Sequence, residues 1–258
     1  MTESRTARRQ RRAAEAAPDV GPAESTLPRR STPLLRNMWL LLRTDLLSEF
    51  RTLETPLTIL FFAFLQVVIF TFSFWADEDT ARAVAPGVLW ITIAFTGTLS
   101  IDRSFAKEQE GRTLTALKLV PGATRALYGS KLVVNLVYLL LVELFTTPLV
   151  VLVLGVPLES SQVPLLVTGL VAGSIGFAAV GTVFSAMLVT VRRRGVLLPI
   201  VLYPVAIPLL VMGVKAVSTL LDHHPDTEVW SWLKMMIAVD VMYVVAGAWL
   251  FGSVLEDE

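Results

Sequence analysis

The chain has 258 residues, of which 54% are hydrophobic and 17% are charged, and its formal net charge at pH 7 is zero. A soluble domain normally carries about 25% charged residues, so this composition favours an all-α polytopic membrane protein. With no cysteine and only two histidines, the sequence excludes disulfides, thiolate nucleophiles and a histidine-rich metal site, and its neutral balance gives no general attraction to nucleic acid.

Residues 1–33 differ in composition from the rest of the chain. They contain seven arginines and four prolines but no apolar run, so they are not a secretory signal. We expect a disordered basic cytoplasmic tail, with a contact to anionic lipid or nucleic acid as the alternative. Residues 34–258 then form a single membrane domain.

The segment 34–54 mixes Leu, Trp and Phe with charged residues and is too polar to span a bilayer. It predicts a helix that lies in the interface plane in contact with membrane lipid, before Thr55-Pro56 turns the chain into the membrane. An ordinary cytoplasmic helix is the alternative.

Six apolar blocks predict six transmembrane helices, because each is long enough to cross the hydrocarbon core. They lie at about 57–75, 84–101, 132–155, 163–191, 195–214 and 233–254. The fourth block is long for one span and must tilt or emerge from the bilayer. The fifth contains Pro199, Pro204 and Pro208, so we expect it to be kinked or broken, with Pro199 and Pro204 as candidate gating positions.

Lys and Arg residues give the orientation, because positive residues are retained on the cytoplasmic side. Ten precede the first span, six lie between the second and third spans if Lys131 is included, and three stand together at 192–194. Of the other connections, 76–83 carries only Arg82, while 155–162 and 222–228 carry none. Both termini are therefore predicted to be cytoplasmic.

A charged stretch, DRSFAKEQEGRT (102–113), separates the second and third spans. We expect the second span to continue as a helix to Glu110, Gly111 to interrupt it, and a second short helix to follow with Leu114 and Leu117 in its apolar stripe. Such a coupling segment (residues 102–121) suits mechanical coupling to a partner; a solvated loop is the alternative. The candidate coupling residues are Asp102, Arg103, Phe105, Glu108, Glu110, Gly111, Leu114 and Leu117.

Two carboxylates, Glu143 and Asp240, fall inside predicted spans. Such residues usually face the bundle interior or water, so both are candidates for translocation or gating, with structural hydrogen bonding as the alternative. Gly169, Gly173 and Gly176 recur on one helix face, which favours close packing within the chain over a dimer seam. We expect neither a catalytic residue nor a metal site.

Residues 101–136 resemble the cytoplasmic segment of the haem exporter B family (CcmB). The resemblance rests on Asp102-Arg103, Phe105, Lys107–Glu110, Thr113-Leu114, Leu117, Leu119, Pro121 and Ser130-Lys131-Leu132, and on the stretches 45–52 and 181–210. It implies an ABC-2-like permease subunit of cytochrome c maturation in a bacterial inner membrane, with haem as possible cargo. It also implies a cytoplasmic ATP-binding subunit, a haem-handling membrane protein and a possible homodimer as partners.

The chain has no ATP-binding loop of its own. The stretch GATRALYGSK (122–131) has six residues between its glycines, one of several departures from the phosphate-binding pattern, so ATP is expected to act through a separate subunit. Two other functions stay open: an ABC-2-type permease for a lipid, drug or polysaccharide, and a membrane scaffold without transport.

Overall fold

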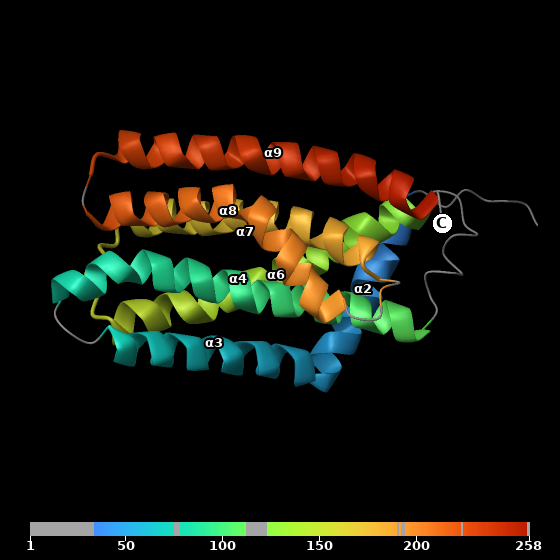
Figure 1. Cartoon of the computed structure of the whole chain (residues 1–258), viewed down its shortest axis with the longest axis horizontal. Coiled ribbons are helices and arrows are strands. Elements are labelled where there is room, and N and C mark those ends of the chain that lie inside the picture. The colour runs from blue at the N-terminus through green and yellow to red at the C-terminus, as the bar shows by residue number, and fades with distance from the viewer. Residues whose placement is uncertain are drawn as a thin grey trace, which may run out of the picture. The chain divides into compact units, whose positions relative to one another are not determined.

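A computed structural model describes residues 34–74, 78–111, 123–189, 191, 194–222 and 224–256. The elements over these residues are all helical (Figure 1). They are α2 (Leu34–Thr52), α3 (Glu54–Ser73), α4 (Glu78–Gly111), α6 (Ala123–Val153), α7 (Val163–Met187), α8 (Arg194–Leu221) and α9 (Asp226–Glu256).

The prediction of six spans is confirmed, because α3, α4, α6, α7, α8 and α9 are each long and apolar enough to cross a membrane. The chain is thus a multi-pass membrane protein. The helices α4, α8 and α9 extend past their predicted apolar blocks at both ends, since backbone hydrogen bonding continues through polar turns that the hydropathy pattern leaves out. Conversely, α7 ends at Met187 rather than at residue 191.

The spans form a bundle in which α7 packs against α4, α6, α8 and α9. In Figure 1, α3 and α9 lie on opposite sides of this bundle. Their outward faces carry large exposed apolar side chains, among them Phe61 and Phe72 on α3 and Trp249 on α9. Such faces suit contact with lipid hydrocarbon, whereas the small residues of α7 suit the centre of the bundle.

Glycines allow one aromatic ring to pack at this centre. A Cβ at Gly173 of α7 would overlap the Trp90 indole and lie 2.7 Å from its Cζ3, and a Cβ at Gly213 of α8 would lie 2.9 Å from its Cδ2. Nearby on α7, Gly169 faces Leu233 and Gly176 faces Asp240, both on α9. The glycines of α7 therefore serve packing within the chain, as the sequence favoured.

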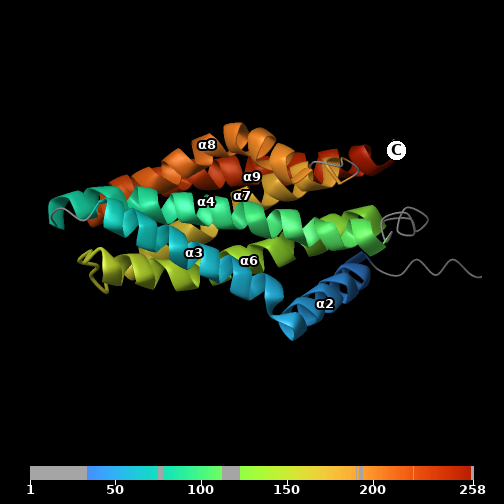
Figure 2. The same ribbon diagram turned by 60° about the horizontal axis from the view of Figure 1, so that its bottom comes forward.

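The three prolines do not break α8, which is a single helix from Arg194 to Leu221. Figures 1 and 2 both show it bent near its middle. Because proline has no N–H, Pro204 leaves the carbonyl of Ile200 without its intrahelical donor. Next to this region, the Tyr243 hydroxyl of α9 donates to the Val205 carbonyl over 2.6 Å, joining the bent segment to α9.

The helix α2 packs on α6 and α3, and Figure 2 shows it at an angle to the bundle. Leu42 is buried, whereas Trp39 and Leu47 are exposed. The turn into the membrane lies at Leu53, whose φ is 54°, and not at Thr55-Pro56 as the sequence suggested. Pro56 instead falls in the first turn of α3, where a missing N–H is tolerated. The location of α2 in the interface plane stays a prediction.

Candidate functional site

The helix α4 continues without a break from the second span to Gly111. This confirms that the span extends as a helix into the coupling segment. The side chains of Glu108 and Glu110 are not described, and Leu114 and Leu117 lie outside the described residues altogether. The second short helix of the segment therefore stays a prediction.

Phe105 is 0% exposed, so its ring packs inside this chain, and its role in coupling stays a prediction. One turn earlier, Ile101 is also fully buried and lies against Gly181 of α7. The cluster around Phe105 is completed by the buried side chains of Leu127, Tyr128, Val183, Ala186 and Val189. The apolar face of this part of α4 is thus covered by α6 and α7 of the same chain.

An ion pair joins this end of α4 to the first residue of α8. Arg194 Nε lies 3.2 Å from Asp102 Oδ1, and the side chain of Arg194 is 8% exposed while that of Asp102 is 28% exposed. The Nη2 group of Arg194 also donates to the main-chain carbonyl of Asp102. One arginine therefore holds both the side chain and the backbone of the same residue, and Arg103 lies half-buried beside it.

Close to this ion pair, a second buried cation joins three helices. Lys131 of α6 lies 2.8 Å from Asp45 Oδ2 of α2, and its ammonium donates to the Ser104 carbonyl of α4 over 3.3 Å. The same ammonium lies 5.9 Å from the centre of the Phe105 ring, within the range of a cation–π contact. We refer to Asp45, Asp102, Lys131 and Arg194 as the ionic junction.

The sequence assigned only Asp102 of these four residues to a site. Lys131 and Arg194 entered as topology signals, because positive residues gather at the cytoplasmic ends of spans. One sequence signal could have marked Lys131: it directly precedes the apolar run LVV at 132–134, where a lysine can be buried only if it has a partner. Its partner on α2 could not be read from the chain.

Glu143 lies in the span part of α6, where it accepts a hydrogen bond from the Ser174 hydroxyl of α7. The carboxylate borders a groove of ≈ 530 Å³ between α6 and α7. Its other polar lining residue is Thr147, and exposed side chains such as Leu144 and Val167 form part of the wall. The groove is therefore apolar, open to the bundle surface, and carries one carboxylate.

Asp240 is buried in α9, against Gly176 of α7. Within the described part of the chain its Oδ1 atom has no hydrogen-bond partner. Ser174 and Gly176 are two residues apart, so they point to nearly opposite sides of α7. The structure therefore does not pair Glu143 with Asp240, but puts them on two sides of one helix.

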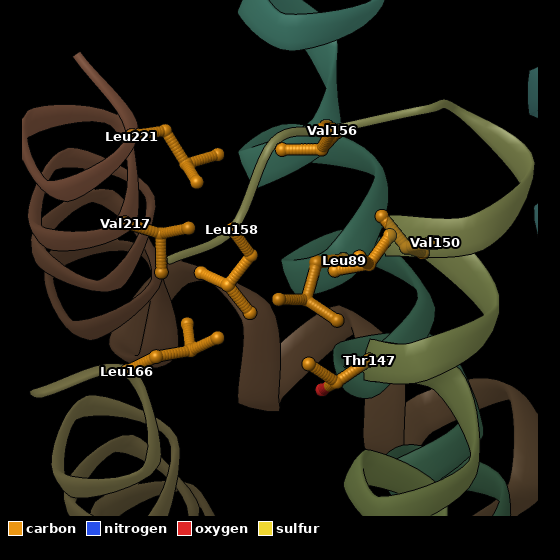
Figure 3. A pocket seen from close by; sticks show the side chains of 10 residues that line it. Leu89, Thr147, Val150, Val156, Leu158, Leu166, Val217 and Leu221 are labelled. Carbon is orange, nitrogen blue, oxygen red and sulfur yellow. The ribbon is translucent and has the colours of Figure 1, made fainter. Parts of the chain in front are cut away.

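Two further hollows among the described residues are smaller. Figure 3 shows one of ≈ 20 Å³ at the end of the bundle, where Thr147, Leu158 and Val217 are among the lining side chains. At about the size of one water molecule, it cannot admit a larger ligand. The other, of ≈ 370 Å³, lies between α4 and α8 and is lined by Trp90 and Tyr203 among others.

Within the part of the chain that the structure describes, histidine and acidic side chains do not gather into a group that could hold a metal ion. At the exposed positions His224 and Glu228, Nδ1 of the imidazole lies 3.4 Å from Oε2 of the carboxylate. His223 lies outside the described residues.

Comparison with known proteins gives one family. The profile of the CcmB protein family matches residues 36–257, a range that includes the whole ionic junction. The chain is 26% identical over 189 residues to "Heme exporter protein B" of Pseudomonas aeruginosa, covering 73% of this chain and 83% of the relative. A protein of the same name from Paracoccus denitrificans is 29% identical over 60% of this chain and 71% of the relative. Another, from Escherichia coli K12, is 28% identical over 72% of this chain and 84% of the relative.

Proposed function

Because the chain belongs to the CcmB protein family, we propose that it is the permease subunit of an ABC-type transporter that exports haem for cytochrome c maturation. The observation that carries this proposal is the family match, together with the name "Heme exporter protein B" of its relatives. The six spans agree with a permease, and the distribution of Lys and Arg favours cytoplasmic termini, so we place the chain in a bacterial inner membrane with both termini in the cytoplasm.

Energy is supplied by a separate ATP-binding subunit that binds the coupling segment. The unbroken helix from the second span to Gly111 supports this role, because a rigid extension transmits force better than a loop. The glycine-containing stretch 122–131 is helical from Ala123 onward, unlike a phosphate-binding loop, which follows a strand.

Haem is the cargo, and a haem-handling membrane protein supplies its ligands. The groove beside Glu143 offers Glu143 and Thr147 as its polar groups, and neither resembles the histidine, cysteine, methionine or tyrosine that usually ligates haem iron. A carboxylate also repels the two haem propionates. The chain therefore contributes helices that move during transport and an apolar surface for haem, and a partner contributes the ligands of the haem iron.

Deleting the gene in the bacterium that encodes it tests the cargo. Covalently bound haem on c-type cytochromes, measured by peroxidase staining of denaturing gels, should be lost and should return with a plasmid copy. Normal holo-cytochrome in the deletion strain would exclude haem export and favour a lipid, drug or polysaccharide as cargo.

Binding of the ATPase subunit is tested separately. Replacing Leu114 and Leu117 by Asp should abolish its co-purification while leaving membrane insertion intact. Phe105 is unsuitable for this test because it is buried. Undiminished co-purification would contradict the role of the coupling segment.

A further inference from the structure

We propose that Lys131 and Arg194 are positioning residues that transmit movement of the end of α4 to α2 and α8. This inference rests on the proposed function, since it requires a partner that moves the coupling segment. It concerns contacts within this chain and goes beyond the coupling segment itself.

Lys131 is the first of these links. Its side chain is 3% exposed, and it holds a carboxylate of α2 and a main-chain carbonyl of α4 at the same time. The helix α2 packs mainly on α6 and α3, so the Asp45–Lys131–Ser104 chain of contacts connects it to α4. A displacement of α4 at Ser104 therefore acts on the ammonium and, through it, on Asp45.

Arg194 is the second link, and it lies at the first residue of α8. Because it binds both the carboxylate and the carbonyl of Asp102, it follows α4 in translation and in rotation. A helix bends most easily where it lacks an internal hydrogen bond. About one turn after Arg194, Pro199 has no N–H, so the carbonyl four residues earlier has no intrahelical donor. The start of α8 can thus move with α4 while the rest of α8 keeps its packing.

Burial explains why these links carry force. An exposed ion pair exchanges its partner for water at little cost. A buried pair cannot, because separating it leaves a charge without solvent. The two cations are the most enclosed members of the ionic junction, at 3% and 8% exposure, so breaking either link is costly.

The chain has no cysteine, so introduced cysteines can be labelled without background. Spin labels at Trp39→Cys of α2 and Val241→Cys of α9, both exposed positions, give one distance. Labels at Gln109→Cys of α4 and Val241→Cys give a second. Both distances are measured by pulsed electron resonance in the complex with its ATPase subunit, without nucleotide and with ATP trapped.

The deciding variant is K131M/D45L, which removes both charges so that neither is left buried and alone. In the unmodified complex both distances should shift on ATP trapping. In K131M/D45L the α4 shift should persist while the α2 shift falls at least fourfold. K131R, which keeps a positive charge at this position beside Asp45, should show the α2 shift of the unmodified chain. The matched control K215M, at an exposed lysine of α8, should also behave as the unmodified chain.

A full α2 shift in K131M/D45L would overturn the role of Lys131. For Arg194, the pair Val196→Cys and Val241→Cys reports on α8, and D102L/R194L should reduce its shift in the same way; an unchanged shift would overturn that role. If neither the α2 nor the α4 distance responds in the unmodified complex, the proposed function itself fails, and the inference fails with it.

Discussion

Removing either partner of the Asp102–Arg194 pair should have unequal effects on stability. The Asp102→Leu variant leaves a guanidinium that is only 8% exposed, whereas Arg194→Leu leaves a carboxylate that is 28% exposed. Water can reach the second group but hardly the first. The variant that lacks the carboxylate should therefore be the less stable of the two.

The expected magnitudes follow from this burial. Leaving a buried charge without its partner costs about 3–5 kcal/mol, and Arg194 keeps the Asp102 main-chain carbonyl, so Asp102→Leu should cost about 3 kcal/mol. Arg194→Leu loses a partly exposed pair, which contributes about 0.2–1 kcal/mol, and one hydrogen bond of about 1 kcal/mol. Its cost should be about 1–2 kcal/mol, because the carbonyl keeps its partner within α4.

Unfolding by sodium dodecyl sulfate in dodecyl maltoside micelles, followed by far-ultraviolet circular dichroism, measures these differences. The double variant should cost less than the sum of the single variants, because neither charge is then left alone. Asp222→Asn, at an exposed acid that directly follows α8, should change stability by less than about 0.5 kcal/mol. Equal costs for the two single variants, or strict additivity, would refute the reasoning.

Three further predictions concern the bundle interior. Gly173→Ala should destabilise the fold by about 1–3 kcal/mol through overlap with Trp90, and Trp90→Leu in the same chain should remove most of that cost in thermal unfolding; a neutral Gly173→Ala would contradict this packing. Ser174→Ala should cost about 1–3 kcal/mol in detergent-induced unfolding, because it leaves Glu143 without its donor, and the variant should recover when Glu143 is replaced by Leu. Pro204→Ala should stabilise α8 by restoring an N–H donor for Ile200 but lower holo-cytochrome formation; undiminished formation would remove Pro204 from the gating candidates.

The number of spans could be predicted because the thickness of hydrocarbon sets a minimum apolar length that six blocks satisfy. The ends of the helices could not be predicted from the apolar blocks. For α4 the apolar block covers 84–101, but the helix runs from Glu78 to Gly111. Hydropathy reports where lipid surrounds the chain, whereas helix length depends on backbone hydrogen bonds that polar residues also make.

Phe105 illustrates a different limit. Phe105 and Ile101 lie one turn apart, a spacing that puts both on one apolar face of α4, but periodicity does not identify what covers that face. The covering elements are α6 and α7 of the same chain. The pairing of Lys131 with Asp45 was equally inaccessible, because it depends on how α2 folds back against α6 after the turn at Leu53.

The two intramembrane carboxylates are not equivalent candidates for contact with cargo. Both lie against α7, but Glu143 borders a groove that reaches the bundle surface, whereas Asp240 is enclosed between α9 and Gly176. A path that touched both would require α7 to move out from between them, and α7 packs against four other spans. Glu143 and Asp240 are almost equally buried, at 4% and 5% exposure, so they differ in what they face: Glu143 borders the groove, whereas Asp240 faces Gly176 of α7.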